Sequence, residues 1–117
     1  MHADIEDFHV PESEVVDRAS ELLRILSDPT RLRLLYALAQ GETNVACLAE
    51  IVGANPAAVS QHLSKLRLSG AVKARRQGTF MYYTVADPAI HSVLRAVLGE
   101  DAPEPAAPAP APAPARA

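Results

Sequence analysis

Residues 55–70, NPAAVSQHLSKLRLSG, predict a short helix with both of its ends marked. Asn55 suits the cap position, because its side-chain oxygen can accept a hydrogen bond from an unpaired N–H of the first turn. Pro56 suits the first helical position, where no N–H is needed. Gly70 can end the helix in a left-handed conformation.

The two faces of this helix differ in chemistry. Val59, Leu63 and Leu66 form an apolar stripe at helical spacing. The opposite face is small and rich in hydrogen-bonding groups, with a cation near its end; it carries Ala57, Ser60, Gln61, Ser64 and Lys65. Short polar side chains suit the base edges of a major groove. An ordinary solvated helix face has a similar composition, so the neighbouring segments must decide between the two interpretations.

The segment before this helix favours DNA binding. Residues 44–52 predict a short helix capped by Thr43 and ended by Gly53. Only Ala54 and Asn55 separate the two helices. Two short helices joined by a tight, Gly-containing turn are typical of a helix-turn-helix, in which the second helix is the usual recognition helix.

Two longer helices are expected further upstream. Residues 13–27 carry a broad apolar stripe, which predicts packing against more than one partner helix. Asp28 and Pro29 mark the start of a second helix, which runs to residue 40. Arg31 and Arg33 lie near its start, where they are either solvated or in contact with phosphate.

After the central helix the hydrophobic period changes to two. Residues 71–76, AVKARR, and residues 79–85, TFMYYTV, alternate as strands do, and a Gly-containing turn joins them. We expect a two-stranded wing with Arg75 and Arg76 at its tip and Gln77 in the turn. Such cations can lie along the DNA backbone or in the minor groove. The alternative is a basic hairpin that is merely solvated.

The last predicted helix, residues 88–98, has a full apolar stripe after an Asp87-Pro88 start. We expect it to pair with a second copy of itself beside the first helix. The resulting homodimer would place two recognition helices on a palindromic operator. One domain is thus expected over residues 13–99, between an acidic, His-containing arm at 1–12 and an Ala/Pro-rich tail at 100–117 that should be disordered.

Composition supports a small DNA-binding domain. The 117 residues are 49% hydrophobic but only 4% aromatic, so the core should be aliphatic. The net charge of -3 hides a basic middle, because residues 24–99 carry nine Lys or Arg and four acids. One cysteine excludes an intrachain disulfide and predicts a cytoplasmic location. We find neither a signal peptide nor an apolar run long enough for a membrane span.

The sequence lacks the features of an enzyme. It has no Gly-rich phosphate loop and no paired carboxylates in a plausible cleft. We therefore expect no catalytic activity. A winged-helix protein that works mainly through a second protein, with the arm or the tail as tether, remains an alternative.

Four stretches together resemble the ArsR/SmtB family of bacterial winged-helix repressors over residues 13–98: LSDPTRLRLLYAL (26–38), LAEIVG (48–53), VSQHLSKLR (59–67) and RRQGTFMYYTV (75–85). The resemblance implies a mainly α-helical fold with a two-stranded wing, forming a homodimer through its first and last helices. It also implies repression of an operator until a metal ion or another inducer binds. By position, it assigns DNA contacts to Ala57, Ser60, Gln61, Ser64, Arg75 and Arg76.

The metal sites of that family match this chain poorly. Asn44 and Ala46 replace two thiolate ligands, and Ala89 replaces a histidine of the last helix. Some nickel- and cobalt-sensing relatives bring an N-terminal arm to that helix. On this pattern the remaining candidate ligands are His2, Asp4, His9, Asp87, His91 and Glu100. Imidazole and carboxylate ligands favour nickel, with zinc or cobalt as alternatives. A regulator without a metal response, controlled by a partner protein or another inducer, is the other interpretation.

Overall fold

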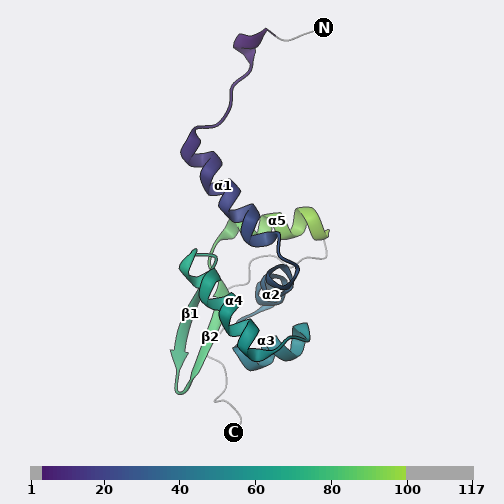
Figure 1. Cartoon of the computed structure of the whole chain (residues 1–117), viewed down its shortest axis with the longest axis vertical. Helices are drawn as coiled ribbons and strands as arrows, with labels where there is room; N and C mark the ends of the chain where they lie inside the picture. Colours follow the sequence, from purple (N-terminus) through teal and green to yellow (C-terminus); the bar gives the residue numbers. More distant parts are fainter. Residues whose placement is uncertain (1–3, 100–117) are drawn as a thin grey trace.

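The computed structural model describes residues 4–99 and follows the predicted order of elements (Figure 1). These are the 3-10 turn η1 (Ile5–Asp7), α1 (Ser13–Leu26), α2 (Pro29–Gln40), α3 (Val45–Val52), α4 (Pro56–Leu68), β1 (Val72–Gln77), β2 (Phe80–Val85) and α5 (Pro88–Leu98). The predicted fold class, mainly α-helical with a two-stranded wing, is confirmed.

Helix α2 lies at the centre of the fold. It packs against α1, α3, α5 and β2. Leu34 and Leu35 are fully buried, whereas Leu32 and Tyr36 are only partly buried. Because neighbours surround α2 on several sides, its buried face is wider than a single stripe.

The start of α3 differs from the prediction by one residue. Asn44, rather than Thr43, caps the helix, and its side-chain oxygen accepts a hydrogen bond of 2.9 Å from the Cys47 N–H. Thr43 instead pairs with Tyr83 of β2 through an isolated antiparallel bridge. Pairing with a strand keeps the backbone of Thr43 out of the helix, so the cap moves to the next residue.

The wing is a tighter hairpin than expected. Its antiparallel register runs from Val72 opposite Val85 to Gln77 opposite Phe80. Only residues 78–79 form the loop, and Gly78 adopts a left-handed φ of 62° that suits glycine. The prediction that Arg75 lies at the tip is therefore wrong, because the cross-strand pairing extends two residues beyond it.

Large parts of the apolar stripes of α1 and α5 are exposed among residues 4–99. The first half of α1 projects away from the body (Figure 1), and Val15, Val16 and Leu23 are exposed. On α5, Val97 is 63% and Leu98 is 45% exposed. Both helices thus bury one part of their apolar stripe in the core and present the rest to the outside.

The N-terminal arm continues beyond α1, away from the other helices (Figure 1). Within residues 4–99, no helix is both long and apolar enough to cross a membrane. The tail predicted at 100–117 lies outside the described residues, as do His2 and Glu100. The predicted domain boundaries stay predictions.

Candidate nucleic-acid interface

The polar face of α4 points outward, as predicted. Val59 and Leu63 are fully buried, and Leu66 is 1% exposed. These three residues fix the rotation of the helix about its axis. All five predicted contact residues on the other face are exposed: Ala57, Ser60, Gln61, Ser64 and Lys65.

Local signals position α4 beside α3. The side chain of Asn55 accepts a 2.8 Å hydrogen bond from the Ala57 N–H. Gly53 ends α3 with a left-handed φ of 69°, and the Ala54 N–H donates to the Ala49 carbonyl. The two helices pack against each other across this turn. The result is a helix-turn-helix whose second helix can enter a major groove.

The start of α2 lies close to α4. The hydrogen bond from the Arg31 N–H to Asp28 holds the pKa of Asp28 below its usual value. Partial burial opposes this shift, and the charges of Arg31 and His62 add to it. His62, on α4, is half-buried.

Arg31 closes the end of α1. Its Nε donates to the Ile25 carbonyl at 2.9 Å, and Nη2 donates to the Arg24 carbonyl at 3.3 Å. The Ile25 carbonyl is one that a helix C-terminus leaves without an intrahelical partner, whereas the Arg24 carbonyl also accepts from the N–H and the hydroxyl of Ser27. Arg33 is exposed. Of the two arginines at the start of α2, Arg33 is therefore the more accessible to a phosphate.

The wing arginines occupy different environments. Arg76 is exposed near the end of β1. Arg75 forms a bidentate ion pair with Glu42, with Nε 2.9 Å and Nη2 2.6 Å from the carboxylate oxygens. This hydrogen bonding raises the pKa of Arg75. Nη1 donates to Gln77 Oε1 at 2.8 Å, and the guanidinium lies over the ring of Tyr82.

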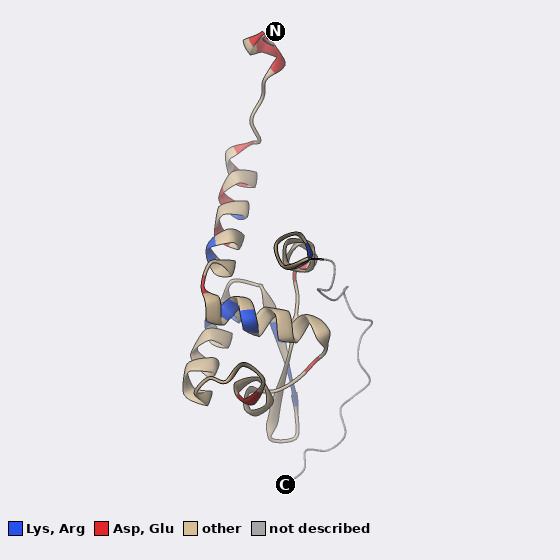
Figure 2. Cartoon of the chain, turned by 90° about the vertical axis from the view of Figure 1, so that its right-hand side faces the viewer, with Lys and Arg blue, Asp and Glu red and all other residues tan. Residues whose placement is uncertain are grey.

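Sequence reasoning missed Glu42. It is the only acid between Asp28 and Glu50, which sets it apart, but no local pattern links it to a residue 33 positions away. Figure 2 shows red segments on the arm, α1 and α3, and blue segments at the start of α2, on β1 and on α1. The acidic residues are therefore concentrated on the arm and α1 but are not confined to them.

The candidate metal ligands that the structure describes do not come together within one chain. Asp4 and His9 lie on the projecting arm, whereas Asp87 and His91 lie at the start of α5 (Figure 1). The part of the chain from 4 to 99 contains no cluster of three or more His, Cys, Asp or Glu that could hold a metal ion. The Asp87 side chain caps α5 by accepting from the Ala89 N–H. These residues, taken within a single described chain, do not fit a metal site.

The candidate ligand His91 is buried on α5, where it is only 8% exposed. Its Nδ1 has no hydrogen-bond partner among the described residues.

Comparison with known proteins agrees with this geometry. Residues 28–74 match the family model "Bacterial regulatory protein, arsR family". The chain is 37% identical over 109 residues to the HTH-type transcriptional regulator KmtR of Mycobacterium tuberculosis, covering 92% of this chain and 83% of that protein. This chain belongs to the arsR family of bacterial regulatory proteins. It is a DNA-binding transcriptional regulator and not an enzyme, as the sequence predicted.

Solved structures of ArsR-type proteins share the fold. The antimony-specific transcriptional repressor AntR superposes with a TM-score of 0.73 at 35% identity, covering 80% of this chain and 86% of that one. The homodimeric winged helix-turn-helix domain of Mb0332 from Mycobacterium bovis gives a TM-score of 0.66 at 30% identity, covering 78% and 87%. The elements that carry the candidate interface therefore belong to a fold shared with other regulators.

Proposed function

We propose that this ArsR-family repressor binds a palindromic operator as a homodimer, with α4 of each copy in a major groove and the wing along the backbone beside it. One observation carries the proposal: the buried stripe of Val59, Leu63 and Leu66 turns the polar face of α4 outward. Such a regulator would act in the cytoplasm, with DNA and a second copy of itself as partners.

The contacts divide into two kinds. Ser60, Gln61 and Ser64, with Ala57 at the helix start, carry short donors and acceptors that can read base edges. Phosphates would be bound by cations and polar groups at the margin of the interface, for which Lys65, Arg76 and Gln77 are the candidates. Arg75 was predicted among these contacts, but its guanidinium is already paired with Glu42.

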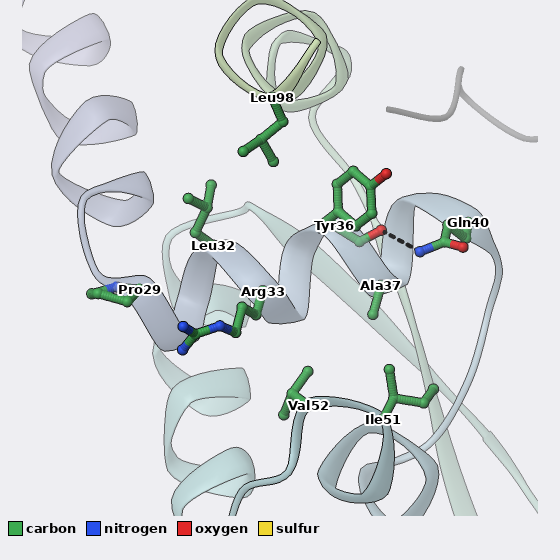
Figure 3. A pocket seen from close by; sticks show the side chains of 9 residues that line it. All are labelled: Pro29, Leu32, Arg33, Tyr36, Ala37, Gln40, Ile51, Val52 and Leu98. Atoms are coloured by element: carbon green, nitrogen blue, oxygen red, sulfur yellow. Dashed lines mark hydrogen bonds between the residues drawn. The ribbon is translucent and has the colours of Figure 1, made fainter. Parts of the chain in front are cut away.

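The homodimer would cover apolar surface that a single chain leaves open. A groove lies between α2, the end of α3 and the end of α5 (Figure 3). Leu98 reaches from α5 toward Leu32 and Tyr36, and the groove is lined by Pro29, Leu32, Arg33, Tyr36, Ala37, Gln40, Ile51, Val52 and Leu98. The exposed apolar residues of α1 and α5 lie on the helices that the sequence assigned to the interface. Light scattering coupled to gel filtration should give twice the monomer mass.

Operator binding tests the proposal. Fluorescence anisotropy with DNA from the protein's own promoter should show that the logarithm of the affinity falls linearly with the logarithm of the salt concentration. Gln61→Ala should lose preference for the operator over random DNA, whereas Arg76→Ala should weaken binding to both. Equal losses on both DNAs for Gln61→Ala would contradict its assigned role in base reading.

We further propose that a transition-metal ion controls repression, with nickel favoured over zinc or cobalt. The support is the chemistry of the arm and α5, which offer imidazole and carboxylate groups without thiolate. AntR is antimony-specific, which supports an inorganic inducer in general and not a transition metal in particular. Since the described candidate ligands, Asp4, His9, Asp87 and His91, do not assemble in one chain, we expect the site to combine the arm of one copy with α5 of the other.

The metal proposal has its own test. Operator binding is measured in EDTA and then with Ni(II), Zn(II) or Co(II). We expect one metal to change the affinity at least about tenfold, a coupling within the usual allosteric range. Isothermal titration of His2→Ala, His9→Ala and His91→Ala should then show weaker metal binding. If no metal changes DNA binding, another inducer or a partner protein must carry the signal.

A further inference from the structure

The loop between α2 and α3 is tied to the wing by backbone and side chain together. Thr43 and Tyr83 exchange two backbone hydrogen bonds, of 3.3 Å from the Thr43 N–H and 2.8 Å from the Tyr83 N–H. One residue earlier, Glu42 accepts two hydrogen bonds from Arg75. We call these four residues, Glu42, Thr43, Arg75 and Tyr83, the wing latch.

We propose that Arg75 is a positioning residue for DNA recognition, which acts through the wing latch and does not itself bind a phosphate. The latch would set the angle between the wing and the helix-turn-helix. This inference rests on the proposed function, because it assigns a role within the same DNA-binding surface.

Three of the five N–H donors of Arg75 are engaged with protein partners, although its side chain is 38% exposed. Nε and Nη2 donate to the Glu42 carboxylate, Nη1 donates to Gln77, and the guanidinium carbon lies 5.3 Å from the centroid of the Tyr82 ring. The Glu42 side chain is only 10% exposed. If Arg75 turned toward a phosphate, it would leave a largely buried carboxylate unpaired, which is costly. The pair should therefore persist when DNA is bound.

The latch also connects the helix-turn-helix to the wing, the two parts of the candidate interface. Asn44, the residue after Thr43, caps α3, and α3 packs against α4. On the other side, Arg75 and Tyr83 belong to the two strands of the wing. A shift of the wing relative to α4 would therefore break contacts within the latch.

Removing the charge of Glu42 distinguishes a positioning role of Arg75 from a phosphate-binding role. If Arg75 bound phosphate, Glu42→Gln would free its guanidinium and remove a negative charge near the DNA, so affinity would rise. If the latch positions the wing, the same change loosens the wing and affinity falls. The two roles thus predict opposite signs for one substitution.

The experiment measures operator affinity against salt for the full chain and its variants. We expect Glu42→Gln and Arg75→Gln each to weaken binding about tenfold, and the double variant to be no weaker than either single one, because both break one contact. The salt slope should stay at the wild-type value in all three. Tighter binding by Glu42→Gln, or a smaller slope for Arg75→Gln, would overturn the proposal.

Two matched variants serve as controls. Arg76→Gln removes an exposed wing cation, and its salt slope should fall by about two if each copy of the dimer loses one phosphate contact. Glu50→Gln removes an exposed acid from α3 and should bind within about twofold of wild type, as expected for a surface change away from the contacts. Circular dichroism confirms that each variant is folded before its affinity is interpreted.

Hydrogen exchange tests the latch without DNA. The Tyr83 amide, bonded to Thr43, should exchange at least about tenfold faster in Glu42→Gln, because local opening sets its exchange rate. The Ala86 amide, bonded to Ala71 outside the latch, is the internal control and should be unchanged. Unchanged exchange at Tyr83 would refute the latch.

If wild type binds no DNA while the Tyr83 amide exchanges as expected, the proposed function fails and the latch remains as a structural element.

Discussion

Arg75 and Tyr82 face each other directly across the wing, with the guanidinium carbon 5.3 Å from the centroid of the tyrosine ring. Tyr82 is 7% exposed, and the ring of Phe80 lies 6.5 Å away from it. The guanidinium is therefore covered on one face by an aromatic ring and paired along one edge with Glu42. This places Arg75 among the structural contacts of the hairpin.

The aromatic ring at position 82 should contribute measurably to stability. Tyr82→Phe keeps the ring and should unfold close to wild type. Tyr82→Leu removes the ring and its contact with the cation, and we expect its free energy of unfolding to lie about 1 kcal/mol below that of Tyr82→Phe. Urea denaturation followed by circular dichroism gives both values. Equal stability of the two variants would show that the ring contributes no more than its hydrophobic bulk.

Substitutions at two neighbouring residues of α4 should affect different properties, one the stability of the fold and the other the binding of DNA. Leu63 is fully buried and Ser64 is exposed. Leu63→Ala should lower the free energy of unfolding by about 2–5 kcal/mol through the cavity that it leaves. Ser64→Ala should change stability by less than about 0.5 kcal/mol, yet weaken operator binding. Denaturation curves and anisotropy on both variants check this, and full operator affinity in Ser64→Ala would remove that residue from the interface.

Local signals in the sequence were enough to define α4. Its cap, its first proline and its buried stripe all lie within residues 55–70, so the predicted outward face matches the structure. The same holds for the starts of α2 and α5, where Asp28 and Asp87 cap as expected. These features depend on residues a few positions apart, which a sequence pattern records directly.

The errors in prediction arose from contacts between distant residues. Thr43 was predicted as a cap but pairs with Tyr83, and Arg75 was predicted at the tip but pairs with Glu42. No local pattern encodes either partner. The stripes of α1 and α5 showed which residues are apolar, but not whether the partner is the same chain or another copy. For the candidate metal ligands, too, the sequence does not show whether they meet within one chain or between two copies.

The side-chain cap of α4 should contribute measurably to the free energy of unfolding. Asn55 accepts a hydrogen bond from the Ala57 N–H. Asn55→Ala leaves that donor without its partner and should cost about 1 kcal/mol, whereas Asn55→Ser should restore most of the loss because serine also caps well. Thermal and urea denaturation of the two variants provide the comparison. Equal losses in both would indicate that the side chain acts in some way other than capping.

Asp28 should make the stability depend on acid pH. Its pKa is lowered in the folded chain, chiefly by the hydrogen bond from the Arg31 N–H. A carboxyl group with a lowered folded pKa stabilises the fold above its unfolded pKa, and this contribution is lost as the pH falls through the folded value. Asp28→Asn can still cap but cannot titrate. Wild type should therefore melt higher than Asp28→Asn at pH 7, and the difference should shrink below about pH 5. A difference independent of pH would contradict this assignment.

The most direct test of the account is selection of DNA by the purified protein from a random duplex library. Wild type should enrich a palindromic motif whose half-sites lie about one helical turn apart or a multiple of it. A variant with Ser60, Gln61 and Ser64 all changed to Ala should remain folded and lose that motif. If wild type enriches no motif, or if the triple variant enriches the same one, α4 does not read the operator and the central claim is wrong.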